Sequence, residues 1–238
     1  EITAAEDIIT PDGTLRYAAG EVVDTVTTDE TGLAESKPLY LGKYEVSEIT
    51  VPSGYVLDTK IHTAELVYAG QEVEITEIAA DYCNERQKAA VSLDKVLEQD
   101  ERFGIGMSGE LSAVTFGLFA AEELTAADGS IIPADGLLEI VSVDENGHAV
   151  CKTDLPFGSY YLKELSTDGH YILSDEKYPI VFEYAGQDAA LVEIKANGGA
   201  PIENKLLYGE LHGLKKDEDG SGLAGALIGL FRADCTEF

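Results

Sequence analysis

The chain repeats itself at an interval of 116 residues, and this repeat constrains the fold more than any other feature of the sequence. Residues 2–13 read ITAAEDIITPDG and return at 118–129 as LFAAEELTAADG. LYLGKYEVSE at 39–48 returns at 155–164 as LPFGSYYLKE. An interval of this length is the size of one ordinary domain. The sequence therefore predicts an array of similar domains rather than one large core.

A third copy begins near the end, where GALIGLFRAD at 225–234 echoes SAVTFGLFAAE at 112–122. We divide the chain into three segments and keep their names below. The N-terminal segment (1–88) is the back of one repeat without its first strand, the central segment (89–204) is a complete repeat, and the C-terminal segment (205–238) is the front of another. The chain stops at almost the point of the repeat at which it starts, which favours a piece of a longer array.

Within each copy the apolar residues alternate with a period of two, which is typical of half-buried strands. YEVSEI at 44–49 and YYLKEL at 160–165 show the pattern most clearly. Strand-like stretches rich in β-branched and aromatic residues are VSLDKV (91–96), AVTFGLF (113–119), YPIVFEY (178–184) and ALVEI (190–194). We count about seven strands in the central segment, which predicts an all-β sandwich. Helical propensity favours a short helical turn at 120–124.

Composition and charge exclude several classes of function. A net charge of -29 opposes binding to DNA, RNA and anionic lipid headgroups. No apolar run approaches the roughly 20 residues that cross a bilayer, so this segment is not expected to insert into a membrane. Three cysteines make neither a disulfide framework nor a metal pair, and Cys83 and Cys151 are expected to be small buried residues; the third is Cys235.

The motifs of enzymes and of metal or cofactor sites are absent from the sequence. It contains no GxSxG, HExxH or P-loop. The four histidines occupy unrelated repeat positions, so no metal site is predicted: His62, His148, His170 and His212. DEDGSG at 217–222 begins like a calcium loop, but Ile228 stands where an EF-hand needs Glu, which favours a hairpin turn. We predict no cofactor and no metabolic enzyme.

Several of these blocks resemble the Cna B-type or SpaA-type repeat of Gram-positive surface proteins and pilins. The resemblance is carried by LGKYEVSEITVPSGYVL at 41–57, by LPFGSYYLKELSTDGHYIL at 155–173, by IENK at 202–205 and by the opening LKKDEDG at 214–220. Across three copies it covers essentially the whole chain. It implies tandem transthyretin-like, Ig-like β-sandwiches, and a place outside the cell on a bacterial wall.

The resemblance also implies an intramolecular isopeptide bond between a Lys of the first strand and an Asn of the last, assisted by a buried acid. In the central segment these positions fall on Lys95, Asn204 and Glu164. Burial disfavours the charged form of Lys95, and a protonated Glu164 is expected to donate a hydrogen bond to the Asn204 carbonyl. The alternatives are an edge-strand lysine and a turn asparagine.

Strand parity agrees with this assignment. Lys95 shares a strand face with Val91 and Leu93, and Glu164 shares one with Leu162, so both charged groups are expected to point into the core. An unpaired buried charge is very costly, so a lysine and a glutamate in one core need each other.

The incomplete copies carry parts of the same set. Glu48 and Asn84 are the equivalents in the N-terminal segment, whose lysine strand is absent from this chain. In the C-terminal segment the lysine position falls on Lys215, with Lys216 as a rival. The missing strand of one segment is present in the other, which suggests strand donation between neighbouring chains.

We therefore predict a structural stalk or spacer of a cell-surface adhesin or pilin-like protein, in contact with neighbouring repeats of its own chain. The alternative is a binding module whose loops recognise a host glycoprotein or matrix protein; exposure of Tyr40, Tyr160 and Tyr161 would favour it. In a third hypothesis a catalytic domain lies outside this segment. Self-cross-linking is a single-turnover step and does not make the chain an enzyme in the usual sense.

Overall fold

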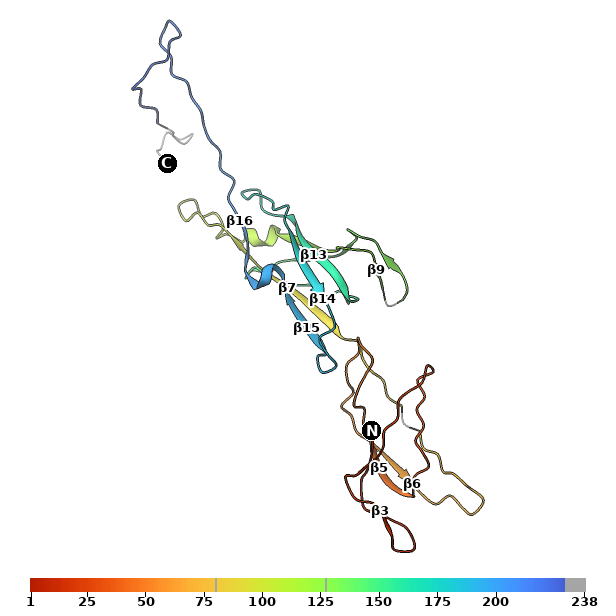
Figure 1. Ribbon diagram of the computed structural model, residues 1–238. Coiled ribbons are helices and arrows are strands. Elements are labelled where there is room, and N and C mark those ends of the chain that lie inside the picture. Colours follow the sequence, from red (N-terminus) through yellow and green to blue (C-terminus); the bar gives the residue numbers. More distant parts are fainter. Residues whose placement is uncertain (80, 127, 230–238) are drawn as a thin grey trace.

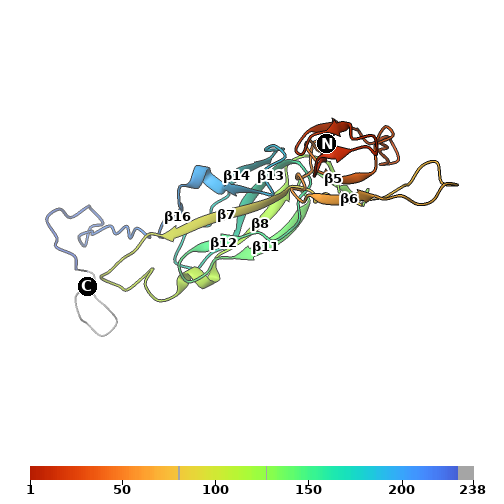
Figure 2. The ribbon, with the colours of Figure 1, turned by 90° about the horizontal axis from the view of Figure 1, so that it is seen from below.

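The computed structural model describes residues 1–79, 81–126 and 128–229. Residues 230–238, which hold Cys235 and the end of the predicted third copy, lie outside the described residues. The described part is elongated, and the N-terminal, central and C-terminal segments follow one another along its length (Figure 1; Figure 2). Its regular structure is almost entirely β, so the predicted fold class is confirmed.

The N-terminal segment forms one sheet and one hairpin. The sheet has the order β4-β1-β5-β6, and β2 pairs with β3 in the hairpin. Its core is a small cluster that includes Ile2, Ile8 and Tyr44. The strands are β1 (Ile2–Ala4), β2 (Ile8–Ile9), β3 (Leu15–Tyr17), β4 (Val22–Asp24), β5 (Gly42–Val46) and β6 (His62–Leu66).

The central segment forms a sandwich of two sheets. One sheet has the order β11-β8-β13-β14, and in the other β12 and β15 flank β7, to which β16 also pairs. The strands are β7 (Lys88–Leu97), β8 (Thr115–Ala120), β9 (Leu124–Thr125), β10 (Ile131–Ile132), β11 (Leu137–Ser142), β12 (His148–Val150), β13 (Gly158–Ser166), β14 (Lys177–Phe182), β15 (Leu191–Lys195) and β16 (Ile202–Asn204). Both sheets contribute to one core, which contains Leu93, Phe116 and Leu162.

Strand β7 is the organising element of the second sheet. It pairs antiparallel with β12 and parallel with both β15 and β16.

The N-terminal segment repeats the first sheet at the interval of 116 residues, with β5 matching β13 and β6 matching β14. It has no counterpart of β7, and the stretches 32–35, 75–79 and 82–84, which correspond to β12, β15 and β16, form no strand. Among its described residues, the N-terminal segment therefore forms only the first of the two sheets.

Three expectations about local structure were wrong in detail. Residues 120–124 form no helical turn, because Ala121 N donates to Ser159 O at 2.9 Å and the sheet overrides helical propensity. The short helices are instead η1 (Glu110–Ala113) and η2 (Ala196–Gly199). Ten strands occur from residue 88 to residue 204, rather than about seven, because short pairs such as β9 and β10 interrupt the loops. Cys151 is buried as predicted, but Cys83 is exposed, in the stretch that lacks a strand partner.

Hydrogen bonds join the N-terminal and central segments where the chain passes from one to the other. The Gln87 amide is buried and donates to Gly186 O at 3.0 Å and to Ala189 O at 2.6 Å, while its oxygen accepts from Ala185 N at 2.8 Å. Leu57 N donates to Gln187 O at 2.9 Å. The junction is therefore a packed contact rather than a free linker.

Gly147 lies directly against the backbone of β7 at Lys95. Its φ is +82, and a methyl group there would overlap the carbonyl oxygen of Lys95. We expect Gly147→Ala to destabilise the central segment by more than the roughly 1–3 kcal/mol of a strained left-handed residue, because a backbone clash is added. Gly32 occupies the matching turn with the same φ and nothing within 4 Å, so Gly32→Ala is the matched control. Guanidinium unfolding of the two variants measures the difference. Equal decreases in the free energy of unfolding would contradict the expected backbone clash.

Candidate functional site

Lys95 projects from β7 into the sandwich and is only 2% exposed. The alternation with Val91 and Leu93 places it there, on the inward face of the strand. Its Nζ donates to Asn204 Oδ1 at 2.8 Å, Val96 O at 3.0 Å and Ile202 O at 3.1 Å. Burial lowers the pKa of Lys95 to about 8, against the opposing effect of nearby carboxylates. A larger share of this amine is therefore neutral at physiological pH than of a free lysine.

Asn204 lies on β16, beside β7 in the same sheet. The parallel register sets Ile202 opposite Lys95, so the Asn204 side chain lies within reach of the lysine. Its Nδ2 donates to both carboxylate oxygens of Glu164 at 2.9 Å and to Thr167 Oγ1 at 3.0 Å. Asn204 is 2% exposed, so water has little access to the amide.

Glu164 reaches the same point from β13 in the facing sheet. It is 1% exposed, and its Oε1 lies 3.9 Å from Lys95 Nζ. Its Oε2 accepts a hydrogen bond from Ser174 N at 2.9 Å. The structure therefore brings Lys95, Glu164 and Asn204 together, and each polar group has partners that offset the cost of burial.

The hydrogen-bond arrangement differs from the sequence expectation in one respect. Glu164 was expected at the Asn204 carbonyl, but it lies at the amide nitrogen, and Lys95 takes the amide oxygen. An ammonium group only donates, so it turns Oδ1 toward itself and leaves the NH₂ group for the carboxylate. Glu164 is thereby placed beside the nitrogen that would have to leave if Lys95 attacked the amide carbon.

Two further partners were missed by sequence reasoning. Ser174 contributes a backbone N–H, which leaves no side-chain signature in the sequence. Thr167 sits in the loop after β13, and nothing in the sequence distinguishes its hydroxyl from other loop hydroxyls.

The N-terminal segment holds the acid and the amide of the same set without a lysine strand. Asn84 Nδ2 donates to Glu48 Oε2 at 2.5 Å and to Val56 O at 3.0 Å. Asp58 N donates to Glu48 Oε2 at 2.9 Å, as Ser174 N does to Glu164. Both side chains are half-buried rather than buried. The structure thus brings Glu48 and Asn84 together, as it does Glu164 and Asn204.

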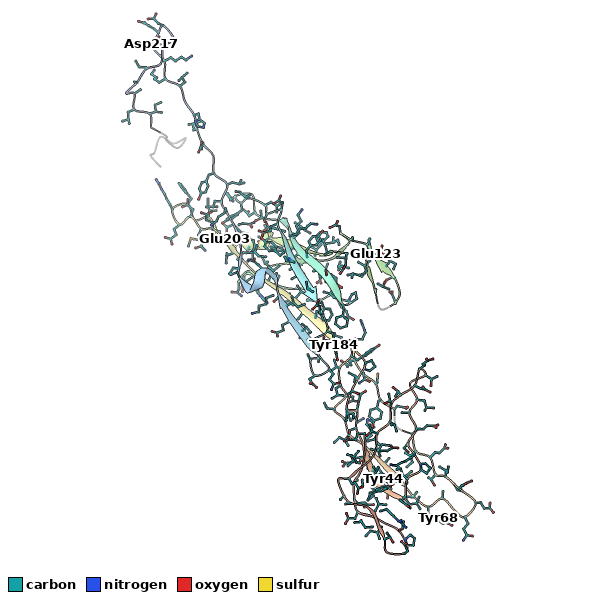
Figure 3. The ribbon with its side chains drawn as sticks, viewed as in Figure 1. Tyr44, Tyr68, Glu123, Tyr184, Glu203 and Asp217 are labelled. Carbon is teal, nitrogen blue, oxygen red and sulfur yellow. The ribbon has the colours of Figure 1, made fainter. Side chains whose placement is uncertain are left out.

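Lys215 and Lys216 directly precede Asp217 in the extended C-terminal segment, and Asp217 lies well away from both Glu203 and Tyr44 (Figure 3). Both are exposed. The predicted hairpin turn at 217–222 is present, with Asp217 N donating to Ser221 O at 2.9 Å and an antiparallel bridge from Lys216 to Gly222.

Other candidate sites gain no support from the part of the chain that the structure describes. No group of three or more His, Cys, Asp or Glu side chains is placed to hold a metal ion there. No helix among those residues is long and apolar enough to span a membrane.

The tyrosines singled out as possible binding residues divide into two kinds. Tyr160 is 1% exposed and its hydroxyl donates to Pro156 O at 2.6 Å, and Tyr161 is 7% exposed and stacks on Phe119. Both are core residues. Tyr40 alone of the three is well exposed, and it lies beside Arg16.

The central segment is thus a two-sheet β-sandwich that encloses the buried Lys95–Glu164–Asn204 cluster. In comparison with known proteins, the family model described as "SpaA: Prealbumin-like fold domain" matches residues 8–79. Those residues are of the SpaA type, and the predicted resemblance is confirmed. The strands of the central segment follow the same first-sheet order at the interval of 116 residues.

One curated protein and several solved structures are also similar to this chain. Over 80 residues it is 30% identical to the trypsin-resistant surface T6 protein of Streptococcus pyogenes serotype M6, which is 33% of this chain and 15% of that protein. The chain thus spans about 15% of the length of this curated relative. The Bacillus anthracis TIE protein matches with 21% identity and a TM-score of 0.47, over 84% of this chain and 35% of the other. BcpA, the major pilin subunit of Bacillus cereus, matches with 20% identity and a TM-score of 0.28, over 50% of this chain and 29% of the other.

Proposed function

We propose that this chain is a structural spacer of a Gram-positive cell-surface or pilin-like protein, exposed outside the cell. The support is the tandem repeat, the elongated arrangement, the hydrogen-bonded junction at Gln87 and the SpaA-type match over residues 8–79. The curated relative is itself named as a surface protein. In this proposal the three segments are copies of one domain, cut at 88/89 and 204/205, and the chain is not a metabolic enzyme.

The observation that carries the proposal is the contact of Lys95 with the Asn204 amide beside Glu164. We propose that these residues form an isopeptide bond. Lys95 gives a proton to Glu164, and the neutral amine attacks Asn204 Cγ. The Nζ–Cγ bond forms, Glu164 returns its proton to Nδ2 as the Cγ–Nδ2 bond breaks, and the ammonia released takes up the proton lost from Nζ. One ammonium plus one amide thus give a secondary amide plus ammonium ion, with no co-reactant.

The position of the proposed bond suits a protein that bears tension. The chain enters the central segment through β7 and leaves it through β16, and the two strands lie side by side and parallel. Pulling on the two ends would shear β16 along β7. A covalent bond from Lys95 to Asn204 would carry that force across both strands without loading the sheet hydrogen bonds.

The first test is the intact mass of the folded full chain. We expect a mass lower than calculated by about 17 Da, which corresponds to one ammonia lost by the nucleophilic route. Peptide mapping should then join the Lys95 and Asn204 peptides. Asn204→Ala should restore the calculated mass, whereas Asn197→Ala, in the exposed η2 turn, should keep the deficit. An unshifted mass in the folded chain would contradict the cross-link.

A further inference from the structure

The side-chain amide of Asn204 donates its two hydrogen atoms to two different residues. Glu164 accepts from Nδ2 with both carboxylate oxygens at 2.9 Å, and Thr167 Oγ1 accepts at 3.0 Å. An amide nitrogen carries two N–H groups, so the carboxylate shares one of them and the hydroxyl takes the other. In the bond formation proposed above, this nitrogen is the atom that leaves. Thr167 therefore contacts the leaving group itself.

The backbone on either side of Thr167 is anchored, which fixes the position of its hydroxyl. Ser166, the last residue of β13, donates from Oγ to Ala113 O at 2.8 Å. The loop that Thr167 begins is hydrogen-bonded to the residue after β16, where Ile172 N donates to Lys205 O at 2.9 Å. The hydroxyl thus meets the amide without any rearrangement of the loop, as a preorganised group must.

Thr167 also lies on the side of the cluster that is open to solvent. Lys95, Glu164 and Asn204 are each at most 2% exposed. Thr167 is half-buried, and Gly169, two residues further on, is exposed. Ammonia formed at Nδ2 has to leave a closed core, and of the two residues that accept from this nitrogen Thr167 is the one in contact with water. We therefore expect the ammonia to leave past the hydroxyl.

We propose that Thr167 is a catalytic residue that binds the departing nitrogen; this rests on the Lys95–Asn204 bond of the proposed function. As Glu164 returns its proton to Nδ2, that nitrogen gains positive charge, and its hydrogen bond to Thr167 becomes charge-assisted. Such bonds are roughly twice as strong as neutral ones. The hydroxyl therefore stabilises the transition state more than the starting amide. Thr167 keeps its own proton and no covalent bond to it forms or breaks, so the atoms balance as before.

The test follows ammonia loss while the full chain refolds. Unreacted chain, recovered in denaturant from inclusion bodies, is diluted into buffer, and the deficit of about 17 Da for one ammonia is followed by intact mass. Thr167→Val keeps the shape without an acceptor and should react about tenfold more slowly, the effect of about 1.4 kcal/mol on the barrier. Thr167→Ser restores the hydroxyl and should react at close to the wild-type rate. Ser166→Ala removes the neighbouring hydroxyl, which does not contact the amide, and should also match the wild type.

A second measurement separates catalysis from packing. The finished cross-link contains no Nδ2, so the hydroxyl has lost its amide partner. Reacted Thr167→Val should therefore unfold in guanidinium at the midpoint of the reacted wild type. A clearly lower midpoint would assign Thr167 a packing role and overturn the proposal.

The remaining outcomes distinguish this proposal from the proposed function. A wild-type chain that loses ammonia, beside a Thr167→Val chain that loses it equally fast, would overturn the role of Thr167 and leave the cross-link standing. Equal slowing of the Val and Ser variants would show that the hydroxyl is not the cause and would overturn it too. A folded wild-type chain that never loses ammonia would overturn the cross-link and this role together.

Discussion

Asn204→Ala is expected to lower the free energy of unfolding of the central segment by about 4–5 kcal/mol, the scale for a cross-link that closes a loop of about 100 residues. Lys95 and Asn204 are 109 positions apart, so the bond would constrain nearly the whole unfolded segment. The variant also leaves Lys95 and Glu164 buried without the amide that separates them. Guanidinium unfolding, followed by the exposure of buried tyrosines such as Tyr160, gives the measurement.

Two companion variants divide this loss into its causes. Asn197→Ala replaces an exposed asparagine of η2 with a φ of +53, and should cost only the roughly 1–2 kcal/mol of a left-handed residue. The triple variant Lys95→Met, Asn204→Leu, Glu164→Leu removes the bond and the polar cluster together. Its loss in free energy of unfolding should be smaller than that of a variant that leaves a single buried charge without a partner. If Asn204→Ala unfolds at the wild-type midpoint, no covalent constraint is present in the native chain.

The cluster is hard to explain as an ordinary ion pair. Removing a lysine and a glutamate from water costs several kcal/mol, and their attraction often does no more than offset it. The 3.9 Å between Lys95 Nζ and Glu164 Oε1 is also long for a strong charge-assisted hydrogen bond. Both charged groups have a shorter contact with Asn204, Lys95 Nζ at 2.8 Å and Glu164 at 2.9 Å, so the amide joins them. This geometry favours a reaction at the amide over simple charge pairing.

The resemblance to the SpaA-type repeat located Lys95, Glu164 and Asn204 in the sequence, and the internal repeat supports the assignment of the glutamate. The interval from Glu48 to Glu164 is the repeat interval, which separates both glutamates from the many acidic residues on the surface. Strand parity then directs Lys95 and Glu164 inward, because each lies two residues from a buried leucine.

The details that escaped prediction depend on tertiary pairing. The stretch 120–124 has helical propensity, but hydrogen bonds to β13 hold its start in a sheet. Ser174 acts through its backbone, and the rotation of the Asn204 amide follows from the donors and acceptors around it. Cys83 is exposed because it lies in a stretch that forms no strand, whereas Cys151 is buried directly after β12.

Glu164→Gln is expected to slow formation of the Lys95–Asn204 bond by about 10²–10⁴-fold, the usual contribution of a positioned acid–base group. Glutamine keeps the shape, and its oxygen still accepts from Asn204 Nδ2, but it neither takes a proton from Lys95 nor passes one to the leaving nitrogen. Unreacted chain is unfolded in denaturant and refolded, and the mass deficit is followed with time. Glu193→Gln, exposed on β15, is the control and should react at the wild-type rate. Equal rates for both variants would remove Glu164 from the chemistry and leave it a packing role.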